Sequence, residues 1–236
     1  MIYIIYILIA LLPSTIWLLW YLRKDKHPEP NTMILRVFIW GMLIAFPAIL
    51  LENGFISLVQ RIPLNETLKL FIIFFLGVAV IEELLKFFVV KFRVLRTTHL
   101  DEPTDAMIYM IIAALGFAAI ENILILTPLF AQNFVPTLGI VFSRFIGATL
   151  LHVLASSIIG YYLALSLFQP QKKFPLLIHG FTLAVILHGF YNIFVVQLSE
   201  RTYLIIPLAL LLISTAILIS IFFKNLSKMK SISMIK

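Results

Sequence analysis

Apolar stretches of about 20 residues, the length of helix that crosses a bilayer core of roughly 30 Å, recur along the whole chain. Backbone N–H and C=O groups find no water inside a bilayer, so such stretches cross it as helices. We therefore expect an all-α, polytopic membrane bundle of about seven transmembrane helices. The expected segments are 2–22, 33–51, 68–92, 105–127, 141–168, 174–198 and 203–223.

The composition leaves little room for a soluble domain. Of the 236 residues, 62% are hydrophobic and 12% charged, whereas a soluble domain has roughly a quarter of its residues charged. We expect residues 1–236 to form a single transmembrane domain. The absence of cysteine excludes disulfides, thiolate metal sites and a cysteine nucleophile. The net charge of +7 is expected to lie against anionic lipid rather than nucleic acid.

The distribution of basic residues predicts the orientation. If the N-terminus is extracytoplasmic, 13 of the 18 basic residues fall in cytoplasmic connections, which is the positive-inside pattern. These are Arg23, Lys24, Lys26, Arg36, Lys91, Arg93, Arg96, Lys172, Lys173, Lys224, Lys228, Lys230 and Lys236. The outer side holds Arg61, Lys69, Arg144 and Arg201. We expect a multi-pass protein of the cell membrane with a cytoplasmic C-terminus.

Polar side chains inside the expected helices are the main indication of function. An ionisable group in the hydrocarbon core costs at least ~2.5–3.5 kcal/mol on insertion scales, and it usually marks a functional site. The third to sixth segments carry Glu82, Glu83, Lys86, Glu121, Asn122, His152, His188 and Asn192. Small and polar residues recur every four positions in the fifth and sixth segments. Such a pattern favours closely packed helix faces around one interior cavity.

Structural explanations exist for single members of this set. Glu82 and Lys86, four apart, could form an ordinary helix ion pair, and a lone His152 or His188 could be an interhelical hydrogen bond. Three carboxylates, two histidines and two amides on four consecutive helices are harder to explain in this way. Glu52 is expected at the outer end of the second helix, and no chemistry is expected from His27, His99 or His179.

The residues that several known kinds of intramembrane protease require are absent from this sequence. The only aspartates, Asp25, Asp101 and Asp105, lie in or beside expected cytoplasmic connections, which argues against an aspartyl pair, and no HExxH string occurs. Ser156 and Ser157 are weak nucleophile candidates, because no glycine-flanked nucleophile motif surrounds them. What remains is a water molecule activated by glutamate, with or without a metal held by glutamate and histidine.

Four motifs together resemble the PrsW family of intramembrane proteases. They are EELLK at 82–86, FAAIEN at 117–122, LLHVLASSIIG at 150–160 and HGFYN at 188–192. Further similarity lies in YLRKDKHPEPNTMILRVF and in LDEPTDAMIY, so the resemblance spans nearly the whole chain in order. The related CAAX prenyl proteases place histidine where this chain has Glu121, and some PrsW proteins carry aspartate where it has Asn192.

The resemblance implies a protease that makes the site-1 cut in a single-span membrane protein, typically an anti-sigma factor, and so releases a stress response. Our hypothesis is that Glu83, assisted by Glu82, is the general base for a water molecule. Glu121, His152 and His188 would hold a divalent metal, which we expect to be zinc.

Asn192 would donate to the oxyanion, and Lys86 would balance the charge of the glutamate pair. A metal-free version, with histidine and Asn192 as oxyanion donors, stays open. Alternatives from other classes are a proton-coupled transporter and a non-catalytic membrane adaptor.

Overall fold

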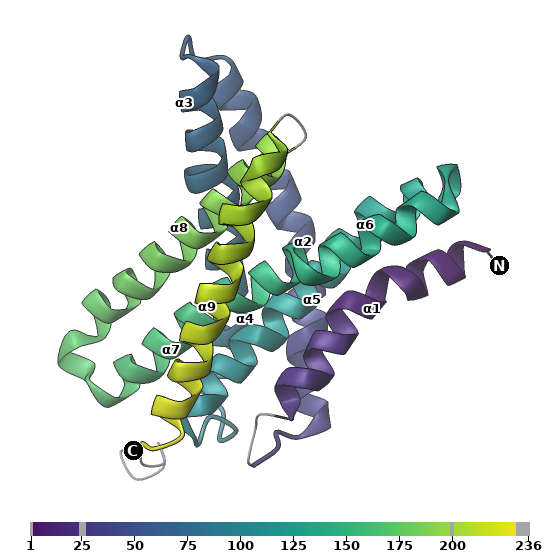
Figure 1. The fold of residues 1–236 in the computed structure, drawn as a ribbon. Helices are drawn as coiled ribbons and strands as arrows, with labels where there is room; N and C mark the ends of the chain where they lie inside the picture. The colour runs from purple at the N-terminus through teal and green to yellow at the C-terminus, as the bar shows by residue number, and fades with distance from the viewer. Residues whose placement is uncertain (1, 24–26, 199–200, 230–236) are drawn as a thin grey trace.

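The computed structural model describes residues 2–23, 27–198 and 201–229, and all regular structure within them is helical (Figure 1). The α-helices are α1 (Ile2–Leu22), α2 (Asn31–Gln60), α3 (Glu66–Phe71), α4 (Val80–Arg93), α5 (Pro103–Gln132), α6 (Phe134–Ile146), α7 (Ala148–Phe168), α8 (Lys173–Leu198) and α9 (Ile205–Leu226). A π-helix, η1 (Ile72–Ala79), joins α3 to α4, and short 3₁₀ turns, η2 (Pro170–Lys172) and η3 (Thr202–Leu204), precede α8 and α9. Asp25, Lys24, Lys26, Lys230 and Lys236, used above, lie outside the described residues.

The expected polytopic helical bundle is confirmed. Six stretches of the described chain are long and apolar enough to cross a membrane, and these correspond to six of the seven expected segments. The remaining segment, expected at 68–92, is helical from Glu66 to Arg93 but is divided among α3, η1 and α4. It also carries Glu82, Glu83 and Lys86, which reduce its apolar character.

Two expected boundaries were wrong. The second helix does not end near residue 51 but continues to Gln60, so Glu52 lies well inside α2 rather than at its end. The connection expected between 127 and 141 is helical except at Asn133, because α5 continues to Gln132 and α6 begins at Phe134. Pro136 permits this because it falls in the first turn of α6, where its missing N–H needs no partner.

Helix α5 lies at the centre of the bundle, where it packs against α1, α2 and α7 (Figure 1). Glycines permit the close approach of its neighbours. A Cβ atom on Gly116 would lie 2.1 Å from the backbone oxygen of Phe38, and one on Gly160 would lie 2.6 Å from Cα of Met107. The small-residue face of α7 is thus packed on α5, which sets the distance between the helices that carry the polar side chains.

Candidate active site

Four side chains from α4, α7 and α8 form a buried cluster. Glu82 and Glu83 come from α4, His152 from α7 and His188 from α8, and each is at most 3% exposed. One possible ligand atom from each residue can be chosen so that all four lie within 4.8 Å of one another. The structure therefore brings together residues that are more than 100 positions apart in the chain.

Glu83 lies at the centre of this cluster and has three hydrogen-bond donors. Its Oε1 accepts from Lys86 Nζ at 2.8 Å and lies 3.0 Å from His188 Nδ1, while its Oε2 accepts from Ser156 Oγ at 2.9 Å. A carboxylate has about four lone-pair positions. One position, on Oε2, is left for a further donor such as water.

Lys86 joins the two glutamates to His152. Its Nζ lies 2.9 Å from Glu82 Oε2, 2.8 Å from Glu83 Oε1 and 2.8 Å from His152 Nδ1, and the side chain is fully buried. An ammonium group can only donate, so Nδ1 of His152 is the acceptor. The ring proton is then on Nε2, which lies 2.6 Å from Glu121 Oε2 and donates to it.

Local structure explains why these residues converge. The three charged residues of α4 lie on one face, because residues three and four apart in a helix are neighbours. Helix η1 ends at Ala79, three residues before Glu82, and π-helical segments are frequent beside functional sites. Gly189 lets η1 approach α8 closely, since a Cβ there would lie 2.6 Å from a ring carbon of Phe75.

Glu121 begins a second set of polar contacts on the other side of His152. Arg144, from the last turn of α6, donates from Nε to Asn122 Oδ1 at 2.5 Å, and its Nη2 lies 3.7 Å from Glu121 Oε2. Asn122 in turn donates to Thr149 Oγ1 at 3.2 Å. Arg144, assigned to the outer rim on the basis of sequence, thus reaches inward to the residues that hold His152.

Comparison with known proteins now identifies the family. Residues 29–221 match the PrsW family intramembrane metalloprotease, and this range contains every residue of the cluster. The chain belongs to the PrsW family. It is 33% identical to Protease PrsW of Geobacillus kaustophilus over 73% of this chain and 71% of that protein. It is 32% identical to Protease PrsW of Oceanobacillus iheyensis, over 85% and 87% respectively.

A third relative is Protease PrsW of Bacillus subtilis, with 30% identity over 79% of this chain and 80% of that protein. No solved structure matches the chain. Membership of the PrsW family makes the chain an intramembrane protease and removes the support for a transporter or a non-catalytic adaptor. The bilayer is accordingly where it meets its membrane protein substrates.

The PrsW family is described as metalloproteases, so the cluster has to be compared with the needs of a metal. Two carboxylates and two imidazoles within 4.8 Å of one another supply the donor types and number that a tetrahedral zinc site uses. The donor set therefore fits a divalent metal. Lys86 Nζ is hydrogen-bonded to three of these four possible metal ligands. A metal could be held by them only if the ammonium group moved away.

The structure brings four of the six predicted site residues into the cluster and places the other two outside it. Glu82, Glu83, His152 and His188 share the cluster. Glu121 lies behind His152, on the side of its Nε2. Asn192, one turn beyond His188 on α8, is half-buried, and its side chain has no hydrogen bond to another described residue.

Sequence reasoning missed three residues that interact with the cluster or with Glu121. Ser156 donates to Glu83, Arg144 interacts with Glu121, and the charge of Glu52 interacts with those of Glu82 and Glu121. For Ser156 a signal was present, because it lies four residues after His152 and therefore shares its helix face. The inward direction of Arg144 depends on α6 packing against α5, which hydrophobic periodicity does not reveal.

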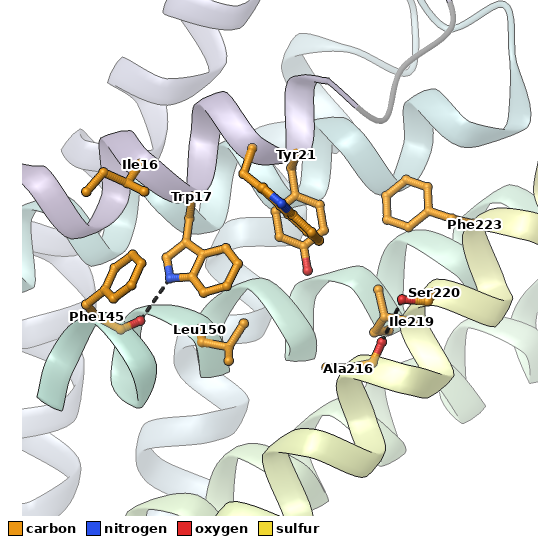
Figure 2. A pocket seen from close by; sticks show the side chains of 10 residues that line it. Ile16, Trp17, Tyr21, Phe145, Leu150, Ala216, Ile219, Ser220 and Phe223 are labelled. Carbon is orange, nitrogen blue, oxygen red and sulfur yellow. Dashed lines mark hydrogen bonds between the residues drawn. The ribbon is translucent and has the colours of Figure 1, made fainter. Parts of the chain in front are cut away.

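Two other features of this PrsW protein lie apart from the cluster. Glu29, Asp101 and Asp105 form a second acidic group, in which Tyr109 donates to Glu29 at 2.5 Å. A cavity of about 380 Å³ lies between α1, α9 and the α6–α7 junction (Figure 2). Two of its polar side chains are bonded within the protein, Trp17 Nε1 to the Phe145 backbone oxygen and Ser220 Oγ to that of Ala216, and the cavity contains no member of the cluster.

Proposed function

We propose that the chain cleaves a single-span membrane protein within the bilayer by means of a water molecule that Glu83 activates. The observation that supports this most strongly is the arrangement of Glu83, which is buried, fixed by Lys86, His188 and Ser156, and left with one free lone-pair position. A carboxylate so held can accept a proton from water directed at a peptide carbonyl. The substrate that the family resemblance implies is an anti-sigma factor.

We assign the metal-holding role to Glu82, His152 and His188, with zinc as the metal, which leaves Glu83 as the base and one coordination position open. When bound, such a metal supplies Lewis-acid polarisation of the scissile carbonyl. Glu121 then orients His152 through Nε2, as carboxylates beside metal-ligating histidines commonly do. In His188, Nδ1 donates to Glu83 and leaves Nε2, which lies 3.9 Å from Glu82 Oε2, to act as a ligand.

The metal-free version uses the same residues in other roles. Glu83 again takes the proton of water, and Lys86 supplies the positive charge that holds the two glutamates. This version requires that His188 carry a proton on Nε2 as well as on Nδ1, so that His188 and Asn192 both donate to the oxyanion as the tetrahedral intermediate forms. The two versions differ in what Asn192 must offer, which is a hydrogen-bond donor in the metal-free version and no donor in the metal version.

The variant Asn192→Asp distinguishes these versions. We expect it to retain cleavage of a single-span membrane reporter within about tenfold of the wild-type rate. A carboxylate one turn from His188 does not disturb a site that holds a divalent cation. A loss on the order of 10²-fold or more would instead assign Asn192 the oxyanion role, because a carboxylate repels the developing negative charge. The rate is measured with purified protein in vesicles, and the metal content is determined on the same samples.

The orientation is also part of this proposal. The C-terminus is expected in the cytoplasm, because 13 of the 18 basic residues then lie on the cytoplasmic side. A reporter that is active only outside the cytoplasm should stay silent when it is fused after Lys236. The same reporter fused between Arg61 and Asn65, in the loop between α2 and α3, should be active. The reverse result would contradict the proposed topology.

A further inference from the structure

Glu52 and Arg144, two residues near the cluster, each have one buried side-chain atom without a hydrogen bond. Within the described part of the chain, four buried side-chain atoms have no hydrogen-bond partner, and two of them are Glu52 Oε1 and Arg144 Nη2. Both residues interact electrostatically with Glu121, one from α2 and the other from α6. Leaving a buried hydrogen-bonding atom without a partner is costly, and such atoms are often completed by a ligand.

Arg144 supplies the unpaired donor. Its Nε is committed to Asn122, while Nη2 stays at 3.7 Å from Glu121, beyond hydrogen-bond distance. The planar guanidinium group has five N–H donors in a fixed fork, so bonding along one edge leaves the other edge available. The side chain is only 15% exposed, and Nη2 itself is buried.

Glu52 supplies an unpaired acceptor. The unpaired Oε1 of Glu52 is an oxygen that can accept a hydrogen bond, whereas the unpaired Nη2 of Arg144 donates, so the two atoms are of opposite type. A ligand that completes both atoms offers a hydrogen-bond donor to Glu52 and an acceptor to Arg144. A peptide backbone carries both at every residue.

The proposed reaction brings such a backbone to this place. A substrate helix must unwind before one of its peptide bonds can reach Glu83, and unwound backbone groups inside a bilayer find no water. Arg144 is separated from Glu83 by the contacts through Glu121, His152 and Lys86, so it does not meet the scissile bond itself. An extended chain advances about 3.3 Å per residue, so a backbone bound at Glu83 reaches Arg144 a few residues further along.

We propose that Arg144 and Glu52 form a subsite for the unwound substrate backbone, a few residues from the scissile bond. Arg144 donates from Nη2 to a backbone carbonyl, and Glu52 accepts from a backbone N–H. This inference rests on the proposed cleavage of a single-span membrane protein. The subsite governs substrate affinity and the position of the cut, whereas Glu83 governs the chemical step.

The variants Arg144→Lys and Glu52→Met test this subsite. Lysine keeps the charge beside Glu121 but lacks the fork, and methionine keeps the length of Glu52 without an acceptor. We expect KM for a single-span reporter to rise about 10-fold or more in each, as for the loss of one hydrogen bond to a charged group. We expect kcat to stay within about threefold. Thermal stability of Glu52→Met should rise, because an unpaired buried carboxylate is removed.

Binding is measured separately from cleavage. In the Glu83→Gln background, the dissociation constant of the same reporter in vesicles should rise by the same factor when Arg144→Lys or Glu52→Met is added. Arg61→Lys, in an exposed loop, is the matched control and should change nothing. A reporter that binds but is not cut by the wild-type protein would contradict the proposed function while leaving this comparison valid.

Two results would overturn the subsite. One is an unchanged KM and dissociation constant in either variant, which would mean that the two unpaired atoms meet water only. The other is an equal fall in kcat and thermal stability for Arg144→Lys with KM unchanged, which would limit Arg144 to tying α6 to α5. Mapping the cut by mass spectrometry adds a third readout, because a loosened subsite should spread cleavage over neighbouring bonds.

Discussion

Replacing Glu83 with glutamine is expected to reduce cleavage by a factor on the order of 10² to 10⁴, the usual contribution of a general base. Glutamine keeps the shape of the side chain and an oxygen that accepts from Lys86, but it cannot take a proton from water. Glu82 stays beside Lys86 at 2.9 Å, so the buried ammonium keeps a negative partner. The fold should therefore survive while the chemical step is lost.

The matched control for this variant is Glu66→Gln, at an exposed position of α3. It makes the same chemical change far from the cluster and should leave the rate at the wild-type value. Turnover of the single-span reporter is measured in vesicles, and thermal unfolding in detergent reports on the fold. If Glu82→Gln and Glu83→Gln together cleave like the wild type, the glutamates are structural and Glu83 is not the base.

Much of the fold follows from the sequence alone, because the bilayer permits few arrangements. Length and hydropathy suffice to locate the spanning helices, since each needs about 20 apolar residues. The boundaries that failed lie where polar or helix-breaking residues resemble an end. Glu52 was expected at the end of the second helix and Pro136 falls in the connection expected between 127 and 141, yet both lie inside helices. Tertiary packing overrides such local signals.

The residues of the cluster were also foreseeable, because ionisable groups in apolar helices are expensive and rarely incidental. Their mutual geometry was not. Sequence spacing assigns a residue to a helix face but does not give the rotation of an imidazole ring. That rotation determines whether Glu121 or the Glu82–Glu83 pair lies beside a given nitrogen of His152. In the structure Nδ1 is directed towards Lys86 and Nε2 towards Glu121.

The relation between depth and sequence position gives a second example. Glu83 is closer to the C-terminal end of its expected segment, 68–92, than His152 is to that of its own, 141–168, which suggests that they lie at different depths. In the structure Ser156, one turn after His152, bonds Glu83, and the longer side chain of Lys86 reaches His152 itself. The length of the Lys86 side chain and the position of Ser156 one turn after His152 thus connect residues that residue counting places at different depths.

Lys86 is expected to contribute strongly to stability, because it is the buried cation between Glu82 and Glu83. Lys86→Met, measured with a chelator present, should destabilise the protein by about 3–5 kcal/mol, the cost of breaking a buried ion pair from one side. Methionine has a similar length but no charge, so Glu82 and Glu83 would be left buried without their cation. The control is Lys69→Met, which breaks a pair whose glutamate is 78% exposed and should cost at most about 1 kcal/mol.

Added zinc should then restore much of the stability of Lys86→Met while changing the wild type less. Lys86 Nζ bonds three of the four possible metal ligands, so its removal frees those donors for a divalent ion. A ligand at 100 times its dissociation constant stabilises the folded state by about 2.7 kcal/mol, so the midpoint of thermal unfolding should rise clearly with zinc. Atomic absorption of the purified variants should show more bound metal in Lys86→Met than in the wild type.

If Lys86→Met is as stable as Lys69→Met in the presence of chelator, Lys86 is not the cation that holds the two glutamates. If zinc fails to stabilise it, Glu82, His152 and His188 do not form a metal site.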